Sequence, residues 1–375
     1  MTWNPKRDDW ISCLHKTDLK LSMVLTGGGA SLASELLKVP GASRTLLEAS
    51  IPYSNQSLSR FLGSTPGSSC NGATARAMAV AAYFRNFPET ENELAGLACT
   101  AALATDRPKK GEHRFHLAIQ TAEKTAVLDA ILSRGMRTRA EEEQCIVELS
   151  LASLGTLIDQ PYQETGLLDT DTLVRKEQQA PSAWVEVFHH RQPACPMLGN
   201  SHKFLPGEGL LCGSFNPLHE GHLQMATLFE TRFGMKTHFE LSIRNADKPP
   251  MDYLSIHERV SRFTNQSVWL SNAATFSEKA KIFPGARFLV GADTIVRIAN
   301  SHYYPGADGF RKAIESIGQN GCRFVVFGRV QKNRFLSLAN LDLPQELHVL
   351  CDEIPEADFR RDISSTEIRE QNTAE

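Results

Sequence analysis

The stretch from Gly213 to His222, Gly-Ser-Phe-Asn-Pro-Leu-His-Glu-Gly-His, constrains the fold of this chain more than any other. It follows a short apolar run at 210–212, which is typical of the end of a buried strand. An amphipathic helix is expected at 223–233, because apolar residues recur there at helical spacing. The stretch therefore predicts a strand–loop–helix turn at the carboxyl end of a strand, where open α/β sheets bind ligands.

The residue types of this loop suit an anionic ligand. Gly213 and Gly221 allow the backbone to approach a phosphate closely, and Pro217 stiffens the loop. His219 and His222 stand three residues apart at the opening of a helix, so both can face one anion. The N–H groups of a helix N-terminus already attract anions, and two imidazoles add donors for charge that develops in a transition state. An ordinary Asn-Pro turn with two incidental histidines is the alternative.

The loop resembles the nucleotide-binding loop of the nucleotidylyltransferase superfamily, specifically the nicotinamide mononucleotide adenylyltransferases. This resemblance implies that His219 and His222 stabilise charge at the α- and β-phosphates of ATP. The nucleotide-binding residues that it implies in the loop are Gly213, Ser214, Phe215 and Asn216.

A second motif lies close to the carboxyl end of the sequence. Residues 362–369, Asp-Ile-Ser-Ser-Thr-Glu-Ile-Arg, are similar to that family's Ile-Ser-Ser-Thr-x-Ile-Arg signature. Ser364 and Glu367 fit a capping box, which places Ser365 and Thr366 in a first helical turn. We expect the three hydroxyl residues to bind the triphosphate, with Arg369 as a forked cation and a hydrated Mg²⁺ bridging the phosphates. A capped helix without a function is the alternative.

Two further positions are expected at the same edge of the sheet. The strand 286–290 ends in Gly291-Ala292-Asp293, which resembles the family's Gly-Ala-Asp turn and implies that Gly291 and Asp293 contact the nucleotide's sugar. A helix cap is an equally weighted role for Asp293. Lys248, in a polar loop after the strand 238–243, is a candidate substrate contact or a solvated lysine. The family often has a tryptophan here that stacks on the pyridine ring, whereas this chain has His-Tyr-Tyr at 302–304. The identity of the acceptor molecule is therefore left open.

The first half of the chain has a different pattern. Thr-Gly-Gly-Gly at 26–29 is followed in order by Pro40-Gly41 and by Tyr53-Ser54-Asn55. Residues 10–160 thereby resemble the nicotinamide-nucleotide amidase domain, also known as the C-terminal domain of the competence-damage protein family. The elements expected here are helices at 30–38, 73–84, 121–134 and 138–159 and strands at 19–25, 94–101 and 114–120.

This domain departs from the family at the residues that carry the chemistry. Val24 stands where the family has a nucleophilic serine, and Leu58 stands where it has a lysine. An apolar side chain can neither attack an amide nor take up its proton. Ser22 and Thr26 have hydroxyl groups nearby but occupy neither position. We therefore predict an inactive, amidase-like domain that binds a nucleotide or serves as a scaffold.

The expected fold class is α/β with two domains. An amidase-like α/β domain at 10–160 is followed by a proline-interrupted connector at 161–207, in which 184–189 reads as a strand. The remainder, 208–375, is expected to be a Rossmann-like nucleotidylyltransferase domain with a parallel sheet.

Composition narrows the class of function. The net charge of −3 argues against a nucleic-acid surface, which needs clustered Lys and Arg. The eight cysteines include no Cys-x-x-Cys pair, so we expect reduced thiols and no metal site of that kind. No signal-peptide core or membrane-length apolar run is present in the sequence, so we expect a cytoplasmic protein without a membrane partner. Self-association into a homo-oligomer is left open.

The resemblance implies an adenylyltransferase that joins the AMP part of ATP to nicotinamide or nicotinate mononucleotide. The acceptor's phosphate attacks the α-phosphorus and pyrophosphate leaves, a reaction that needs alignment and charge stabilisation but no protein nucleophile. Two alternatives stay open. One is a nucleotidylyltransferase for another phosphorylated acceptor, and the other is a nucleotide-binding sensor with weak ATP hydrolysis.

Overall fold

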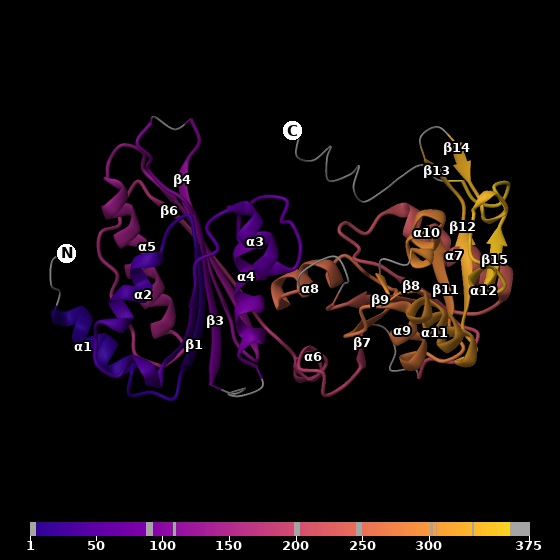
Figure 1. Cartoon of the computed structure of the whole chain (residues 1–375), viewed down its shortest axis with the longest axis horizontal. Helices are drawn as coiled ribbons and strands as arrows, with labels where there is room; N and C mark the ends of the chain where they lie inside the picture. Colours follow the sequence, from indigo (N-terminus) through magenta and orange to yellow (C-terminus); the bar gives the residue numbers. More distant parts are fainter. Residues whose placement is uncertain are drawn as a thin grey trace. The chain divides into compact units, whose positions relative to one another are not determined.

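The chain folds into two compact units, each of which contains one large sheet (Figure 1). The first unit consists of Met1–Val185 and Asp247–Ser255, and the second of Glu186–Ala246 and Ile256–Glu375. The computed structural model describes residues 5–87, 93–107, 110–198, 203–244, 250–300, 303–304, 306–331 and 334–360. No helix in these ranges is long and apolar enough to cross a membrane.

The sheet of the first unit has six strands in the order β2-β1-β3-β4-β5-β6. The strands are β1 (Lys20–Thr26), β2 (Leu46–Ser50), β3 (Leu94–Ala102), β4 (His113–Gln120), β5 (Lys124–Leu132) and β6 (Thr172–Gln179). The first three are parallel, and β4, β5 and β6 continue the sheet as antiparallel neighbours.

Helices pack on both faces of this sheet (Figure 1). They are α1 (Pro5–Leu14), α2 (Ala30–Leu37), α3 (Asn55–Leu62), α4 (Gly72–Arg85) and α5 (Arg139–Gly155), with a 3₁₀ turn at Ala42–Arg44. Successive strand residues point to opposite faces, so Leu25 joins the core against α2 and α5 whereas Val24 joins the core against α3 and α4. Helix α5 begins at a capping box in which Thr138 and Glu141 each accept the other's backbone N–H.

The segment 250–255 lies in the range expected for the second domain, but it packs within the first unit. The backbone N–H of Tyr253 donates to Thr125 Oγ1 at 3.0 Å, and its hydroxyl donates to the Ala122 carbonyl at 2.7 Å. Arg76 of α4 forms an ion pair with Asp252 at 3.1 Å. The partition of the chain into units therefore does not follow a single cut in the sequence.

The second unit has a seven-stranded sheet in the order β15-β12-β11-β8-β9-β10-β7. The strands are β7 (Ala194–Leu198), β8 (Gly209–Cys212), β9 (Thr237–Ser242), β10 (Ser267–Ser271), β11 (Arg287–Gly291), β12 (Arg323–Phe327) and β15 (Cys351–Ile354), with a separate hairpin of β13 (Arg329–Gln331) and β14 (Arg334–Leu336). Neighbouring strands are parallel except β7, which is antiparallel to β10. The remaining helices are α6 (Ser182–Phe188), α7 (Glu220–Phe233), α8 (Tyr253–Val260), α9 (Phe276–Ile282), α10 (Ala292–Ala299), α11 (Gly306–Gln319) and α12 (Gln345–His348), with a 3₁₀ turn at Leu338–Asn340.

Strand β8 is the point at which the strand order reverses. From β8 the chain builds β9 and β10 to one side and then returns to build β11, β12 and β15 on the other. The loops after β8 and β11 therefore leave the sheet in different directions, and the crevice between them is the ligand position of doubly wound sheets. The expected α/β class and parallel sheet are confirmed.

Two sequence-based assignments were wrong. Residues 121–134, expected as a helix, form β5, because a tight turn in which Thr121 N–H donates to the Lys124 carbonyl pairs this stretch with β4. Residues 184–189, expected as a strand, belong mostly to α6, which starts after Pro181 with Trp184 N–H donating to the Pro181 carbonyl. The expected connector also contributes β6 to the first sheet and β7 to the second.

Candidate active site

The loop after β8 is held by a buried aromatic side chain. Phe215 is 1% exposed, and its ring centroid lies 5.2 Å from that of His222 and 5.3 Å from that of Phe263. Its φ of 44° is in the left-handed region, and a Cβ on Gly213 would come within 2.9 Å of the Phe215 ring. The buried side chain of Phe215 thus anchors the loop to the core of the unit. Ser214 and Asn216 are half-buried in the same loop.

His219 and His222 lie together at the start of α7. Their rings are stacked, with centroids 3.8 Å apart and planes 24° from parallel. The backbone N–H of His219, at the N-cap, donates to His222 Nδ1 at 3.3 Å. Because Nδ1 accepts, a neutral His222 carries its hydrogen on Nε2, which makes that nitrogen a donor. His219 Nδ1 is buried and has no hydrogen-bond partner in the described part of the chain.

Both imidazoles are neutral near pH 7. Burial, and then the neighbouring His219, lower the pKa of His222 to about 3. Burial, and then the positive charge of Arg329, lower the pKa of His219. An anion bound beside the stacked rings would favour their charged forms and raise both pKa values. The pair is therefore suited to accept a negatively charged group.

The segments that follow β11 and β12 place a carboxylate, Asp293, and a guanidinium, Arg329, in this crevice. Asp293 Oδ2 lies 3.4 Å from Arg329 Nη1, and Arg329 follows directly on β12 and Gly328. A Cβ on Gly291 would meet Asp293 Oδ1 at 2.6 Å. The N-cap of α10 is Gly291, so Asp293 lies in the first helical turn and not at the cap position. Arg329 was not among the predicted site residues. Its position directly after a buried strand is the sequence feature that could have identified it.

Several predicted residues lie outside the described residues. These are Lys248, Ser364, Ser365, Thr366 and Arg369, together with His302. Of the aromatic residues that follow, Tyr304 donates its hydroxyl to the Ile298 carbonyl at 3.0 Å, which fixes it in the core. The Tyr303 ring lies 5.8 Å from the Arg297 guanidinium carbon.

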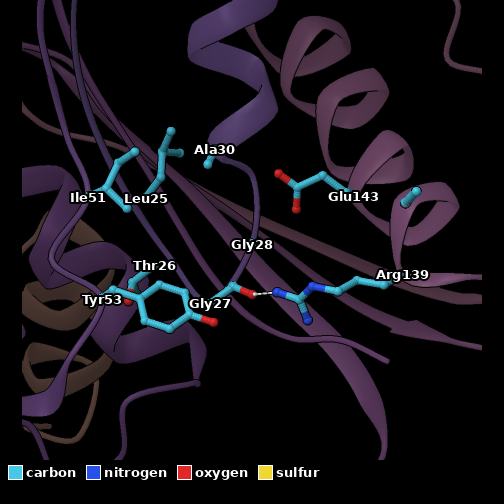
Figure 2. A pocket seen from close by; sticks show the side chains of 10 residues that line it. Leu25, Thr26, Gly27, Gly28, Ala30, Ile51, Tyr53, Arg139 and Glu143 are labelled. Carbon is cyan, nitrogen blue, oxygen red and sulfur yellow. Dashed lines mark hydrogen bonds between the residues drawn. The ribbon is translucent and has the colours of Figure 1, made fainter. Parts of the chain in front are cut away.

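The first unit has a cavity of about 420 Å³ at the Thr26-Gly27-Gly28 turn (Figure 2). Arg139 Nη2 donates to the Gly27 carbonyl at 2.9 Å, and the Glu143 carboxylate accepts the N–H groups of Gly29 and Ser31 at 2.8 and 3.0 Å. The protein's own carboxylate therefore occupies the N-terminus of α2, where a phosphate would otherwise bind.

The positions of the expected nucleophile and base are part of a hydrophobic core. Val24 and Leu58 belong to the same buried cluster, together with Met78 of α4. Ser22 is buried and accepts a hydrogen bond from Asn86 Nδ2 at 2.9 Å, and the Thr26 hydroxyl donates to the Pro52 carbonyl at 2.9 Å. Neither hydroxyl is paired with a base in these contacts.

Comparison with known proteins gives matches to both halves. A probable nicotinate-nucleotide adenylyltransferase of Gloeobacter violaceus is 29% identical over 179 residues, which cover 44% of this chain and 84% of that protein. Two solved structures match the amino-terminal half. One is a competence/damage-inducible protein from Agrobacterium tumefaciens, with 21% identity and a TM-score of 0.35, and the match covers 42% of this chain and 99% of that chain. The other is a competence-damaged superfamily protein from Escherichia coli, with 15% identity and a TM-score of 0.35, and the match covers 42% of this chain and 94% of that chain. The cytidylyltransferase-like family matches residues 210–371. Residues 210–371 are therefore cytidylyltransferase-like, which supports a nucleotidyltransferase activity for this part of the chain.

Proposed function

We propose that this chain transfers the adenylyl group of ATP to nicotinamide or nicotinate mononucleotide, forming NAD or its deamido form and releasing pyrophosphate. The observation that carries the proposal is the stacked pair His219 and His222 at the start of α7, beside the strand where the sheet order reverses. The acceptor class is supported by the relative from Gloeobacter violaceus, which is described as acting on the nicotinate nucleotide.

In this reaction an oxygen of the acceptor's phosphate forms a bond with the α-phosphorus, and the bond to the bridging oxygen of pyrophosphate breaks. Negative charge grows on that bridging oxygen as the bond breaks. His222 Nε2–H and the N–H groups at the start of α7 would donate to the oxygens that gain charge, because donors already in position need no reorganisation. Arg329 would add a positive charge on the β12 side of the crevice.

The phosphates distant from the reaction centre need separate contacts. We assign Ser364, Ser365, Thr366 and Arg369 to the β- and γ-phosphates, Gly213, Ser214 and Asn216 to the nucleotide, and Lys248 to the acceptor. The carboxylate of Asp293 would accept a hydrogen bond from the sugar, with Arg329 holding it in place at 3.4 Å.

Mg²⁺ would arrive with ATP in this proposal. The described residues contain no group of three or more His, Cys, Asp or Glu arranged to hold a metal ion. The hydrated ion would be held mainly by phosphate oxygens of ATP, because Mg²⁺ keeps several waters when it binds with substrate phosphates. When bound, it would offset part of the negative charge of the triphosphate.

The test is product analysis with the full chain. ATP, Mg²⁺ and one phosphorylated acceptor at a time (nicotinamide mononucleotide, nicotinate mononucleotide or a sugar phosphate) are incubated, and the products are identified by mass. A dinucleotide formed with either pyridine nucleotide supports the proposal and its relative rate assigns the acceptor. An adduct formed only with the sugar phosphate would contradict the proposal and indicate a nucleotidylyltransferase for another acceptor. ADP or AMP without any adduct would indicate a nucleotide sensor.

A further inference from the structure

A group of chemically active side chains lies in the first unit, and none of them lines the cavity in Figure 2. Cys70 directly precedes Asn71, the N-cap of α4. His116 of β4 pairs in register with Thr100 of β3 on one side and with Asp129 of β5 on the other. The Cys70 thiol lies 3.8 Å from the Thr100 carbonyl oxygen, so the sheet register brings the cysteine, the histidine and the aspartate together.

The histidine is oriented by the aspartate. His116 Nδ1 and Asp129 Oδ1 are 2.6 Å apart, so Nδ1–H donates to the carboxylate and Nε2 is directed away from it. Nε2 is buried and has no hydrogen bond of ordinary geometry in the described structure. The neighbouring thiol of Cys70 interacts with this ring strongly enough to change the pKa of both groups.

Charge separation is favoured between the sulfur and the ring. Burial opposes it, but His116 and then Arg114 outweigh burial and lower the pKa of the Cys70 thiol. Burial likewise opposes the charged imidazole, but Asp129 and Cys70 raise the pKa of His116 to about 9. His116, in turn, lowers the pKa of Asp129. A thiolate beside an imidazolium is the reactive form of a nucleophilic cysteine.

The segment before α4 holds the thiol in place. The Thr100 hydroxyl donates to the Ser69 carbonyl, and the Thr74 hydroxyl donates to the Ser68 carbonyl at 2.6 Å. Asn71 Oδ1 accepts the Thr74 N–H at 2.7 Å. Cys70 is therefore fixed beside the first N–H groups of a 14-residue helix, whose partial positive charge favours a thiolate.

We propose that Cys70, His116 and Asp129 form a second nucleophilic site, which cleaves esters or thioesters through an acyl-cysteine intermediate. The thiolate sulfur bonds to the carbonyl carbon, and the bond to the leaving alcohol or thiol breaks as His116 Nε2–H gives that group its proton. Water then attacks the acyl-cysteine, and His116 takes a proton from it. The acid leaves, and the thiolate–imidazolium pair is restored.

Two other cysteines of the first unit, Cys99 and Cys145, differ from Cys70. Burial raises the pKa of the thiols of Cys99 and Cys145, and both residues are buried in the core. Cys70, in contrast, is only half-buried. Among the described residues, three cationic groups act on the triad: Arg114 on β4, Arg76 on α4 and Lys176 on β6. Arg76 is also ion-paired with Asp252.

Alkylation of the full chain with iodoacetamide measures the thiolate directly. Cys13 is exposed on α1 and serves as the internal control, with both sites followed by mass analysis of peptides. At a pH of about 6 we expect Cys70 to react at least about tenfold faster than Cys13, because only a thiolate with a lowered pKa persists there. Replacing His116→Gln or Asp129→Asn should reduce that ratio. A Cys70 that reacts no faster than Cys13 in the unaltered protein would overturn the proposal.

The acyl step is tested with p-nitrophenyl acetate. We expect a burst of p-nitrophenolate that matches the amount of chain, an acetyl group on the peptide that contains Cys70, and slower turnover afterwards. Cys70→Ser should lose the burst and the acetyl group, whereas Cys13→Ser should retain both. A burst of equal size in Cys70→Ser, or an acetyl group found only on other residues, would contradict the acyl-cysteine. Because no adenylyl transfer is involved, either result is independent of the proposed function.

Discussion

The imidazole of His219 stacks on that of His222 at 3.8 Å, while the backbone N–H of His219 donates to His222 Nδ1. This contact decides which nitrogen of His222 carries the hydrogen, and hence which one can donate to a ligand. It also places two neutral rings where a phosphate would meet the start of α7. The arrangement makes His222 the side chain on which the proposed reaction should depend most.

Replacing His222→Ala should lower kcat/KM for dinucleotide formation by roughly 10²–10³, or about 3–4 kcal/mol of transition-state stabilisation, because a positioned donor is lost. His348→Ala is the matched control, since His348 is exposed on α12. Steady-state kinetics with ATP and the preferred acceptor measure the effect, and thermal unfolding shows whether the variant is folded. A His222→Ala enzyme with full rate would show that the site is wrongly assigned.

Arg369 should serve the leaving pyrophosphate through its forked guanidinium. Arg369→Lys retains the positive charge but loses the paired donors, so we expect it to be impaired less than Arg369→Ala. The effect should fall on the transfer rate at saturating ATP, measured as pyrophosphate release. Wild-type rates of pyrophosphate release in both variants would show that Arg369 does not serve the leaving group.

The stability of the protein should depend on His222 below neutral pH. Its folded-state pKa of about 3 is lower than the usual value of about 6.5, so the unfolded chain binds a proton that the folded chain excludes. The contribution is fully present above the unfolded pKa and is lost as pH falls from about 6.5 towards 3, with a slope of up to about 1.4 kcal/mol per pH unit. Urea unfolding over this range should therefore show a weaker pH dependence for His222→Gln. Identical slopes in both proteins would mean that His222 titrates normally in the fold.

The first unit should release no ammonia from nicotinamide mononucleotide. Val24 and Leu58, which stand where the sequence resemblance implies a nucleophile and a lysine, are buried in one apolar cluster. Losing either member of a cooperating pair removes most of the rate, and both are absent. A coupled ammonia assay on the full chain tests this. Ammonia release that Ser22→Ala or Thr26→Ala abolishes would reveal a relocated nucleophile.

The sequence by itself determined the local chemistry of the loop at 213–222. A strand end, a glycine-bounded turn and a helix start are specified by neighbouring residues, so their order could be read directly and was confirmed in β8 and α7. The same holds for Val24 and Leu58, whose apolar character alone excludes the amidase chemistry.

Tertiary structure decided everything that depends on pairing between distant segments. Residues 121–134 form a strand because β4 and β6 lie on either side, and no local pattern reveals those partners. Glu143 reaches the N-terminus of α2 from 112 residues away along the chain. Arg329 reaches the crevice only because β12 lies beside β11. Cys70, His116 and Asp129 likewise meet through sheet register, which is set by long-range hydrogen bonds and the packing of a shared core.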